Sequence, residues 1–374
     1  MQRHPCCVNQ MQPSSDPYLA STQVTLNGPN SPGVASGTGA QQAGTEGAEP
    51  RPILEVRGLR VCFKTEQGLA QAVNDVSLDL YRGELLAIQG ESGSGKSVTT
   101  RAIMGLLRGP RVTVSAERLT LAGQDMLRLS EDERRAMRGD RISLVFQDAL
   151  SALNPVLSVG AQIGELFRVH RGLTAKAARE RTIELLRTVR IPAAERRVDD
   201  YPHQFSGGMR QRILIAMAIA LEPDVLIADE PTTALDVTVQ AQILDLLDGL
   251  RQEFGMAILL ITHDLGVVAK VADRVAVMYA GRIVETAAVE PIFGRPAHPY
   301  TEALLGSIPS IARRGTDMQP IPGAPPSLLA LPSGCSFHPR CRHRRSICSI
   351  EAPPLRSPAP GRASACHFAE DLLA

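Results

Sequence analysis

The stretch Gly90-Glu91-Ser92-Gly93-Ser94-Gly95-Lys96-Ser97 decides how this 374-residue chain can fold. It fits the phosphate-loop pattern GxxxxGK(S/T), in which glycines let backbone N–H groups turn inward around phosphate oxygens. The apolar run 85–88 before it is typical of a buried strand, and the residues after it favour a helix whose N-terminus faces the phosphates. A strand, this loop and a helix in sequence predict a site for a phosphate-bearing ligand.

The helix expected after the loop begins with Lys96, Ser97 and Val98. A lysine here offers a compact cation to the β- and γ-phosphates of a nucleotide, whereas the planar fork of arginine would not fit the same cavity. The chain is rich in arginine, and lysine occurs only at Lys64, Lys96, Lys176 and Lys270. Since the Ser97 hydroxyl is suited to ligate Mg²⁺, the sequence predicts a site for ATP with its magnesium ion.

The composition limits what the whole chain can do. Hydrophobic residues make up 44% of it, charged residues 21%, and the formal net charge is +1, which gives no global attraction to nucleic acid or to an anionic membrane. The longest apolar run, 213–221, is shorter than a membrane-spanning helix, and residues 1–12 lack the pattern of a secretory signal. We therefore expect a cytosolic chain that reaches a membrane only through a partner, and no nucleic-acid partner.

Apolar runs and helical patterns alternate along most of the chain. Strands are expected over 53–56, 59–63, 76–80, 85–88, 142–146, 225–228, 257–261 and 275–278. Helices are expected over 96–107, 159–170, 175–190, 206–221, 237–253 and 265–271. The pattern predicts an α/β fold: a phosphate-loop core with a mainly parallel sheet, N-terminal antiparallel strands and an all-helical insertion.

Changes in composition divide the chain into parts. Residues 1–52 are rich in Gly, Ser, Thr, Gln, Pro and Asn, which predicts a disordered leader. Residues 53–296 are expected to form one nucleotide-binding domain, with its helical part at about 148–222. Residues 297–374 are rich in proline and arginine and end in a group of cysteines, so they are interpreted as a small appended Cys-rich domain.

Two carboxylates and two further polar residues are expected near the phosphate loop. The apolar run 225–228 ends in Asp229 and Glu230, and strand ends of a parallel sheet face the ligand crevice. Asp229 can hold Mg²⁺ and Glu230 can polarise the attacking water. His263 and Gln147 follow two other strands, from which His263 can reach a γ-phosphate and Gln147 can reach Mg²⁺ or the water.

A second anion site is expected at the start of the helix over 206–221. Ser206 is a good N-cap residue, and the stretch Ser206-Gly207-Gly208-Met209-Arg210-Gln211 leaves N–H groups exposed at the helix start. This site lies far along the chain from Lys96, so it is expected to serve a phosphate bound to another subunit.

Together, and in this order, these motifs resemble the nucleotide-binding subunits of ABC transporters. The segments Ala228–Gln240 and His298–Leu305, and the pattern from Gly334 to His367, resemble more closely the ATPases of bacterial oligopeptide/dipeptide importers. The resemblance covers about residues 53–368.

The resemblance implies two ATP molecules held between two such subunits. Each would contact residues 90–98 of one subunit and Ser206, Gly207, Gly208, Met209 and Gln211 of the other. It further implies that Phe63 stacks on adenine and that Asp236 lies in the loop joining the two sites. The implied partners are a second ABC ATPase, expected to be a paralogue with an identical subunit as the alternative, two membrane permeases and an extracytoplasmic binding protein. The implied location is the cytoplasmic face of the bacterial plasma membrane.

Four of the seven cysteines lie near the end of the chain, namely Cys335, Cys341, Cys348 and Cys366. Their spacing matches neither common zinc sites nor bacterial ferredoxins, so spacing alone leaves one metal centre or four free thiols open. The resemblance favours a [4Fe–4S] cluster, with Zn²⁺ as the alternative.

The function expected from the resemblance is ATP hydrolysis coupled to the import of di- or oligopeptides. Nickel, glutathione or another small solute is the alternative cargo. A more distant alternative is an ABC-fold ATPase acting on nucleic acid or ribosomes. Such proteins usually carry two ATPase units, long coiled-coil inserts or strongly basic faces, and the sequence shows none of these.

Overall fold

The larger of two sheets forms the centre of the computed structural model, which describes residues 51–148, 152–233, 235–307 and 321–374. Its strand order is β12-β13-β11-β10-β3-β9-β8-β7, and the part from β10 to β7 is parallel. The strands are β3 Leu85–Gln89, β7 Ile142–Val145, β8 Val225–Asp229, β9 Ala257–Ile261, β10 Arg274–Tyr279, β11 Arg282–Ala288, β12 Arg356–Ala359 and β13 Arg362–Ser364. The expected mainly parallel sheet is confirmed.

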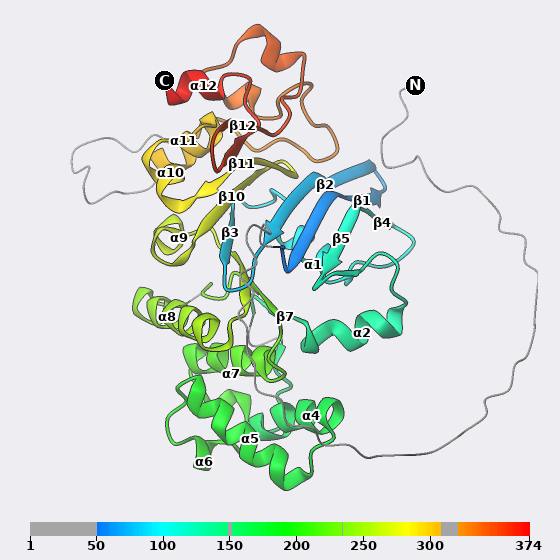
Figure 1. The fold of residues 1–374 in the computed structure, drawn as a ribbon, viewed down its shortest axis with the longest axis vertical. Coiled ribbons are helices and arrows are strands. Elements are labelled where there is room, and N and C mark those ends of the chain that lie inside the picture. Colours follow the sequence, from blue (N-terminus) through cyan, green and yellow to red (C-terminus); the bar gives the residue numbers. More distant parts are fainter. Residues whose placement is uncertain (1–50, 149–151, 234, 308–320) are drawn as a thin grey trace, which may run out of the picture. The chain divides into compact units, whose positions relative to one another are not determined.

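The smaller sheet is antiparallel and comes from the first part of the domain (Figure 1). β1 pairs with β2, β4 and β5, and β5 pairs with β6. The strands are β1 Leu54–Thr65, β2 Gly68–Leu80, β4 Val112–Ser115, β5 Arg118–Leu121 and β6 Gln124–Asp125. The expected N-terminal antiparallel strands are therefore present.

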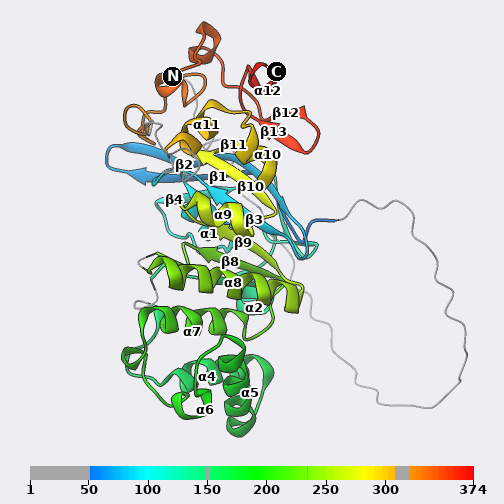
Figure 2. The ribbon, with the colours of Figure 1, turned by 90° about the vertical axis from the view of Figure 1, so that its left-hand side faces the viewer.

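Alternation along the central strands explains how the larger sheet is covered on both faces. Leu226 and Ala228 of β8 pack in one apolar cluster with α7 and α8, whereas Val225 and Ile227 pack in another with α1 and the smaller sheet. Figures 1 and 2 show α8 and α9 on one side of the parallel strands. These helices are α1 Lys96–Ile103, α2 Glu131–Asp140, α7 Gly207–Ile219, α8 Val237–Phe254 and α9 Leu265–Val271.

The segment between β7 and β8 contains helices and no strand among its described residues. It forms a separate group below the sheet in both views (Figures 1 and 2). Its described elements are α4 Val159–Arg171, α5 Ala175–Thr188, α6 Ala194–Arg197, the 3-10 turn η2 Pro202–Gln204 and α7. Ser158 and Thr174 cap α4 and α5, since each side chain accepts a hydrogen bond from a backbone N–H of the first turn.

The C-terminal part continues the larger sheet, because β13 pairs with β11 over Glu285–Ala287. Its other elements are α10 Val289–Gly294, α11 Pro299–Gly306, η4 His338–Arg340, η5 Ser346–Ser349 and α12 Ala369–Leu373. Residues Pro52–Ala374 form one unit by their contacts. The division at residue 296 and the disordered leader stay predictions, and residues 1–50 of that leader lie outside the described residues.

One helix is shorter than the sequence indicates. The helix expected over residues 96–107 ends at Ile103, because Gly105 takes a left-handed conformation with φ 64°. Across the part of the chain that the structure describes, no helix combines the length and apolarity needed to cross a membrane.

Candidate ATP site

The phosphate loop joins the end of β3 to the start of α1 and depends on glycine at its first position. Gly90 has φ 151°, and a Cβ placed on it would lie 2.1 Å from the backbone oxygen of Met278 in β10. No other residue type fits so close to a neighbouring strand. Gly95, at φ 106°, directly precedes α1 and leaves the first N–H groups of that helix free of a side-chain cap.

Lys96 is buried inside the loop, with 6% of its surface exposed. Its Nζ donates hydrogen bonds to the backbone oxygens of Gly90 (2.8 Å) and Glu91 (3.0 Å). Burial lowers the pKa of Lys96, and the charges of Glu230, Asp229 and Glu91 oppose that shift. A buried cation held by loop carbonyls is available to exchange those partners for phosphate oxygens.

Ser97 and Asp229 face each other between α1 and β8. The Ser97 hydroxyl donates to Oδ1 of Asp229 at 2.9 Å. Burial raises the pKa of Asp229, while the hydrogen bond from Ser97 lowers it. A hydroxyl and a carboxylate oxygen are ligands that Mg²⁺ prefers, so the structure brings together two of the three residues expected to hold it.

Glu230 is the meeting point of three other side chains. Its Oε2 accepts hydrogen bonds from Gln147 (Nε2, 3.1 Å) and Thr233 (Oγ1, 2.9 Å), and Nδ1 of His263 lies 3.5 Å from it. The backbone of Glu230 has φ 49°, an uncommon conformation for a residue other than glycine, which sets its side chain at the end of β8. The structure thus brings Gln147, Glu230 and His263 together, and it adds Thr233, which the sequence analysis missed.

The start of α7 is a capped helix end, as expected. The Ser206 hydroxyl accepts a hydrogen bond from the backbone N–H of Met209 at 3.4 Å. A Cβ on Gly208 would lie 2.5 Å from Cγ1 of Val239, so glycine at this position allows the close approach of α7 and α8. Asp236 caps α8 by accepting from the N–H of Val239 at 2.9 Å.

The residues of this helix start are separate from the loop of the same chain. Within the described ranges, none of Ser206, Gly207, Gly208, Met209 and Gln211 hydrogen-bonds to residues 90–98. Gln211 is buried in α7. Phe63 lies on β1, half-buried against the core beside the smaller sheet. The roles given to Phe63 and to the α7 start stay predictions.

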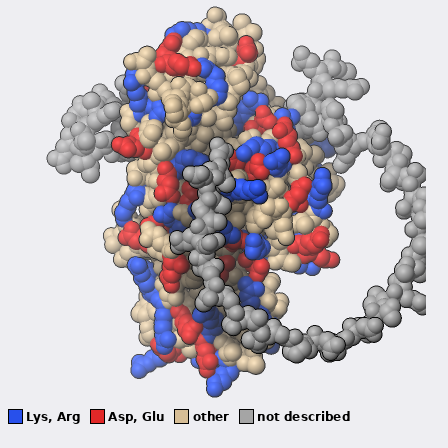
Figure 3. Space-filling model, in the orientation of Figure 1, with Lys and Arg blue, Asp and Glu red and all other residues tan. Residues whose placement is uncertain are grey.

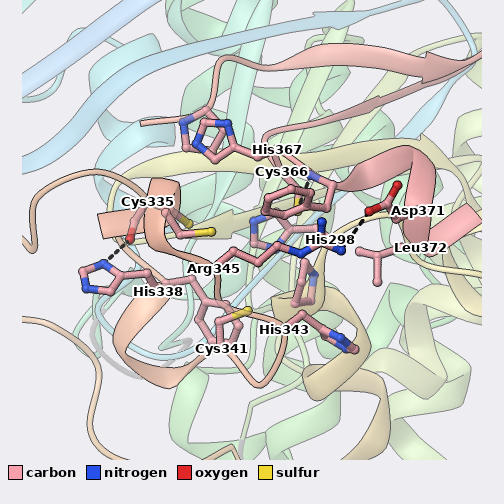
Figure 4. Close-up of a pocket in the computed structure, with 15 residues that line it drawn as sticks. His298, Cys335, His338, Cys341, His343, Arg345, Cys366, His367, Asp371 and Leu372 are labelled. Carbon is pink, nitrogen blue, oxygen red and sulfur yellow. Dashed lines mark hydrogen bonds and ion pairs between the residues drawn. The ribbon is translucent and has the colours of Figure 1, made fainter. Parts of the chain in front are cut away.

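The four C-terminal cysteines line a single cavity of about 270 Å³, together with His298, Phe337 and several polar side chains. Figure 4 shows that Cys335, Cys341 and Cys366 come from three separate segments of the tail. Burial raises the pKa of the Cys341 and Cys366 thiols to about 11, and nearby cysteines add to the shift. In the parts of the chain described, no three His, Cys, Asp or Glu residues are gathered closely enough to hold one metal ion.

Comparison with known families gives two matches. Residues 73–233 match the family described as ABC transporter. Residues 284–348 match the family described as the C-terminal region of oligopeptide/dipeptide transporters.

Similar proteins agree with both matches. The chain is 53% identical over 296 residues to the dipeptide transport ATP-binding protein DppD of Bacillus subtilis, covering 79% of this chain and 88% of that protein. It is 49% identical over 335 residues to the oligopeptide transport ATP-binding protein OppD of Salmonella typhimurium, covering 89% and 99%.

Among solved structures, the fold is similar to that of a dimeric bacterial ABC transporter cassette. The TM-score is 0.57 at 28% identity, over 63% of this chain and 99% of that one. A post-hydrolysis state of that cassette, bound to ADP and phosphate, gives a TM-score of 0.55 over the same shares at 28% identity.

The bond from Thr233 to Glu230 makes a prediction. Thr233→Val is expected to lower kcat for ATP about tenfold with little change in KM, because a hydrogen bond to a charged group that orients Glu230 is lost. Thr233→Ser keeps the hydroxyl and is the control. Steady-state phosphate release measures both variants; equal kcat in Thr233→Val and wild type would show that Thr233 does not orient Glu230.

Proposed function

This chain belongs to the ATP-binding subunits of ABC transporters, in the oligopeptide/dipeptide family, and from that membership we propose that its ATPase activity drives uptake of dipeptides or short oligopeptides. The observation that carries the proposal is the complete group of polar residues around one sheet edge: Lys96, Ser97, Asp229, Glu230, Gln147 and His263. The match over residues 284–348 and the names of the similar proteins support the peptide cargo.

In the proposed reaction, Glu230 takes the proton of the water that attacks the γ-phosphate of ATP. Its carboxylate is already oriented by Gln147 and Thr233, so little reorganisation is needed. Lys96 would balance the charge of the β- and γ-phosphates, and His263, whose Nδ1 lies 3.5 Å from Oε2 of Glu230, would contact the γ-phosphate. Mg²⁺, held by Ser97, Asp229 and Gln147, would withdraw charge from the phosphate oxygens.

We propose that two subunits complete each ATP site. At the start of α7, Ser206 caps the N–H of Met209, and within the described residues the N–H groups of Gly207 and Gly208 make no hydrogen bond to the loop of the same chain, so they can meet a nucleotide held by a neighbour. The similar cassette solved as a dimer supports this arrangement. The neighbour is proposed to be a paralogous ATPase, bound with it to two permeases at the cytoplasmic face of the plasma membrane and fed by an extracytoplasmic binding protein.

Transport is favoured over action on nucleic acid by the charge distribution. On the face shown in Figure 3, Lys and Arg alternate with Asp and Glu over the described surface, without a broad basic patch. Nucleic-acid binding draws most of its affinity from such patches. Nickel and glutathione remain the alternative cargoes.

Replacing Glu230 by Gln tests the reaction and its cargo together. Glu230→Gln is expected to bind ATP and to lose hydrolysis by on the order of 10²-fold or more, because the proton acceptor is gone. In cells that lack the chain, wild type should restore uptake of labelled di- and tetrapeptides, whereas Glu230→Gln should not. Near-normal hydrolysis in this variant would refute the role of Glu230. Restored uptake of nickel or glutathione alone would refute the peptide cargo.

The two-subunit site predicts different defects for two variants. Lys96→Ala should abolish tight ATP binding to the isolated subunit, because the phosphates lose their cation. Ser206→Arg should leave that binding intact and reduce hydrolysis in the assembled transporter, because Ser206 would serve the neighbour's nucleotide. Binding is measured with a fluorescent ATP analogue; equal loss in both isolated variants would contradict the shared site.

We propose that Cys335, Cys341, Cys348 and Cys366 hold one [4Fe–4S] cluster. The proposal is supported by the resemblance of the tail and by one cavity of about 270 Å³ that all four thiols line. Among the described residues, no three such ligands are gathered closely enough to hold a metal ion, so binding would have to draw the thiols together. When bound, such a cluster would supply folding energy to the tail or a redox-active centre.

Metal analysis tests this assignment. Protein purified without oxygen should be brown and hold about four irons per chain, since a cluster of this type contains four. Cys341→Ser should lose the colour and iron, and Cys7→Ser, outside the group of four, should keep them. One zinc per chain without iron would replace the cluster by a structural zinc site.

A further inference from the structure

The phosphate loop is joined to the Cys-rich tail by an ion pair across 249 positions of sequence. Nη1 and Nη2 of Arg340 donate to the two carboxylate oxygens of Glu91 at 2.7 and 2.9 Å. Glu91 is the first residue after Gly90 in the loop, and Arg340 ends η4, directly before Cys341. Two parallel bonds of this kind fix both distance and orientation.

Several further contacts hold the Arg340 side chain in place beside Glu91. Its side chain is 6% exposed, its Nε donates to the oxygen of Pro322 at 2.8 Å, and Nη1 lies 3.3 Å from the hydroxyl of Tyr279. Nη2 also donates to the oxygen of Gly323 at 3.3 Å. The pair with Glu91 raises the pKa of Arg340, so the guanidinium stays charged.

A second residue of the C-terminal part holds the same loop position. The hydroxyl oxygen of Tyr300, in α11, accepts a hydrogen bond from the backbone N–H of Glu91 at 2.8 Å. Its ring is buried against Tyr279 (4.5 Å between centroids) and Phe337 (5.3 Å). Since Lys96 donates to the Glu91 carbonyl, the amide, the carbonyl and the carboxylate of Glu91 all have partners.

The charge of Glu91 gives this contact a consequence for nucleotide binding. The Glu91 carboxylate lies close enough to Lys96 to act on its charge. Without Arg340, the Glu91 carboxylate would be a half-buried, unpaired anion beside Lys96. A negative charge at that place would repel the triphosphate that Lys96 must bind. Arg340 neutralises that anion and fixes both of its carboxylate oxygens.

We propose that Arg340 is a positioning residue of the ATP site: from the Cys-rich tail, it fixes and neutralises Glu91 and so maintains the loop in its nucleotide-binding form. The proposal rests on ATP binding at this loop and on neither the cargo nor the metal of the cysteine pocket. Because Arg340 directly precedes Cys341, one short segment both lines that pocket and holds the phosphate loop.

The test compares four variants, each in the assembled transporter, by their KM and kcat for ATP. Arg340→Met removes the charge and keeps the stem, and it should raise KM about tenfold while kcat falls less than threefold. Glu91→Gln combined with Arg340→Met should reduce that KM defect at least threefold, because the unpaired anion is gone although the packing loss is the same. Arg340→Lys should lie between wild type and Arg340→Met. Arg344→Met, an exposed arginine on the same tail, should leave KM unchanged.

Either of two results would overturn the proposal: an unchanged KM in Arg340→Met, or a double variant no better than the single one. If Arg340→Met does not fold, Arg340→Lys is compared with the double variant Arg340→Lys/Glu91→Gln, and the expected difference in KM is smaller. Equal KM in these two variants would overturn the proposal. Wild type in the same assay separates the proposals, since absence of ATP hydrolysis there would refute the proposed function itself.

Discussion

The parallel register of β3, β9, β8 and β7 places four chain segments at one edge of the larger sheet, and each part of the ATP site begins in one of them. Ile261 of β9 pairs with Ile88 of β3 on one side and with Asp229 of β8 on the other, so these strands end level with each other. The phosphate loop, Glu230, His263 and Gln147 follow directly. A shift of one residue in this register would exchange the side chains that pack against the two covering layers, so the core that packs the sheet also fixes the catalytic geometry.

Burial of charge is the main cost of this arrangement. Lys96 and Asp229 are both buried, and burial moves their pKa values in opposite directions, each toward the neutral form. Their mutual attraction, the hydrogen bond from Ser97 and the loop carbonyls around Lys96 offset part of that cost. The site is therefore prepared for a ligand that brings its own charges of both signs, as a nucleotide with a divalent cation does.

The sequence predicted the strand, loop and helix around Lys96, and the meeting of Gln147, Glu230 and His263, because strand ends of a parallel sheet share one edge. It missed Thr233, which has no pattern apart from its neighbours, and the end of α1, which depends on the conformation of Gly105. It also missed Arg340, one of many arginines in the chain. Arg340 and Glu91 are 249 positions apart, so their pairing follows from the packing of the folded chain and not from local periodicity.

The tail illustrates how packing adds to what composition indicates. Its proline- and arginine-rich sequence has too few apolar residues for a core of its own, which is why a metal centre is proposed as its support. The structure adds two further supports: the pairing of β13 with β11, and the packing of Phe337 on Tyr279 and Tyr300. Since Tyr300 also contacts the phosphate loop, the contacts that hold the tail in place are partly those that hold the loop. A tail attached in this way cannot be removed or displaced without changing the environment of Lys96.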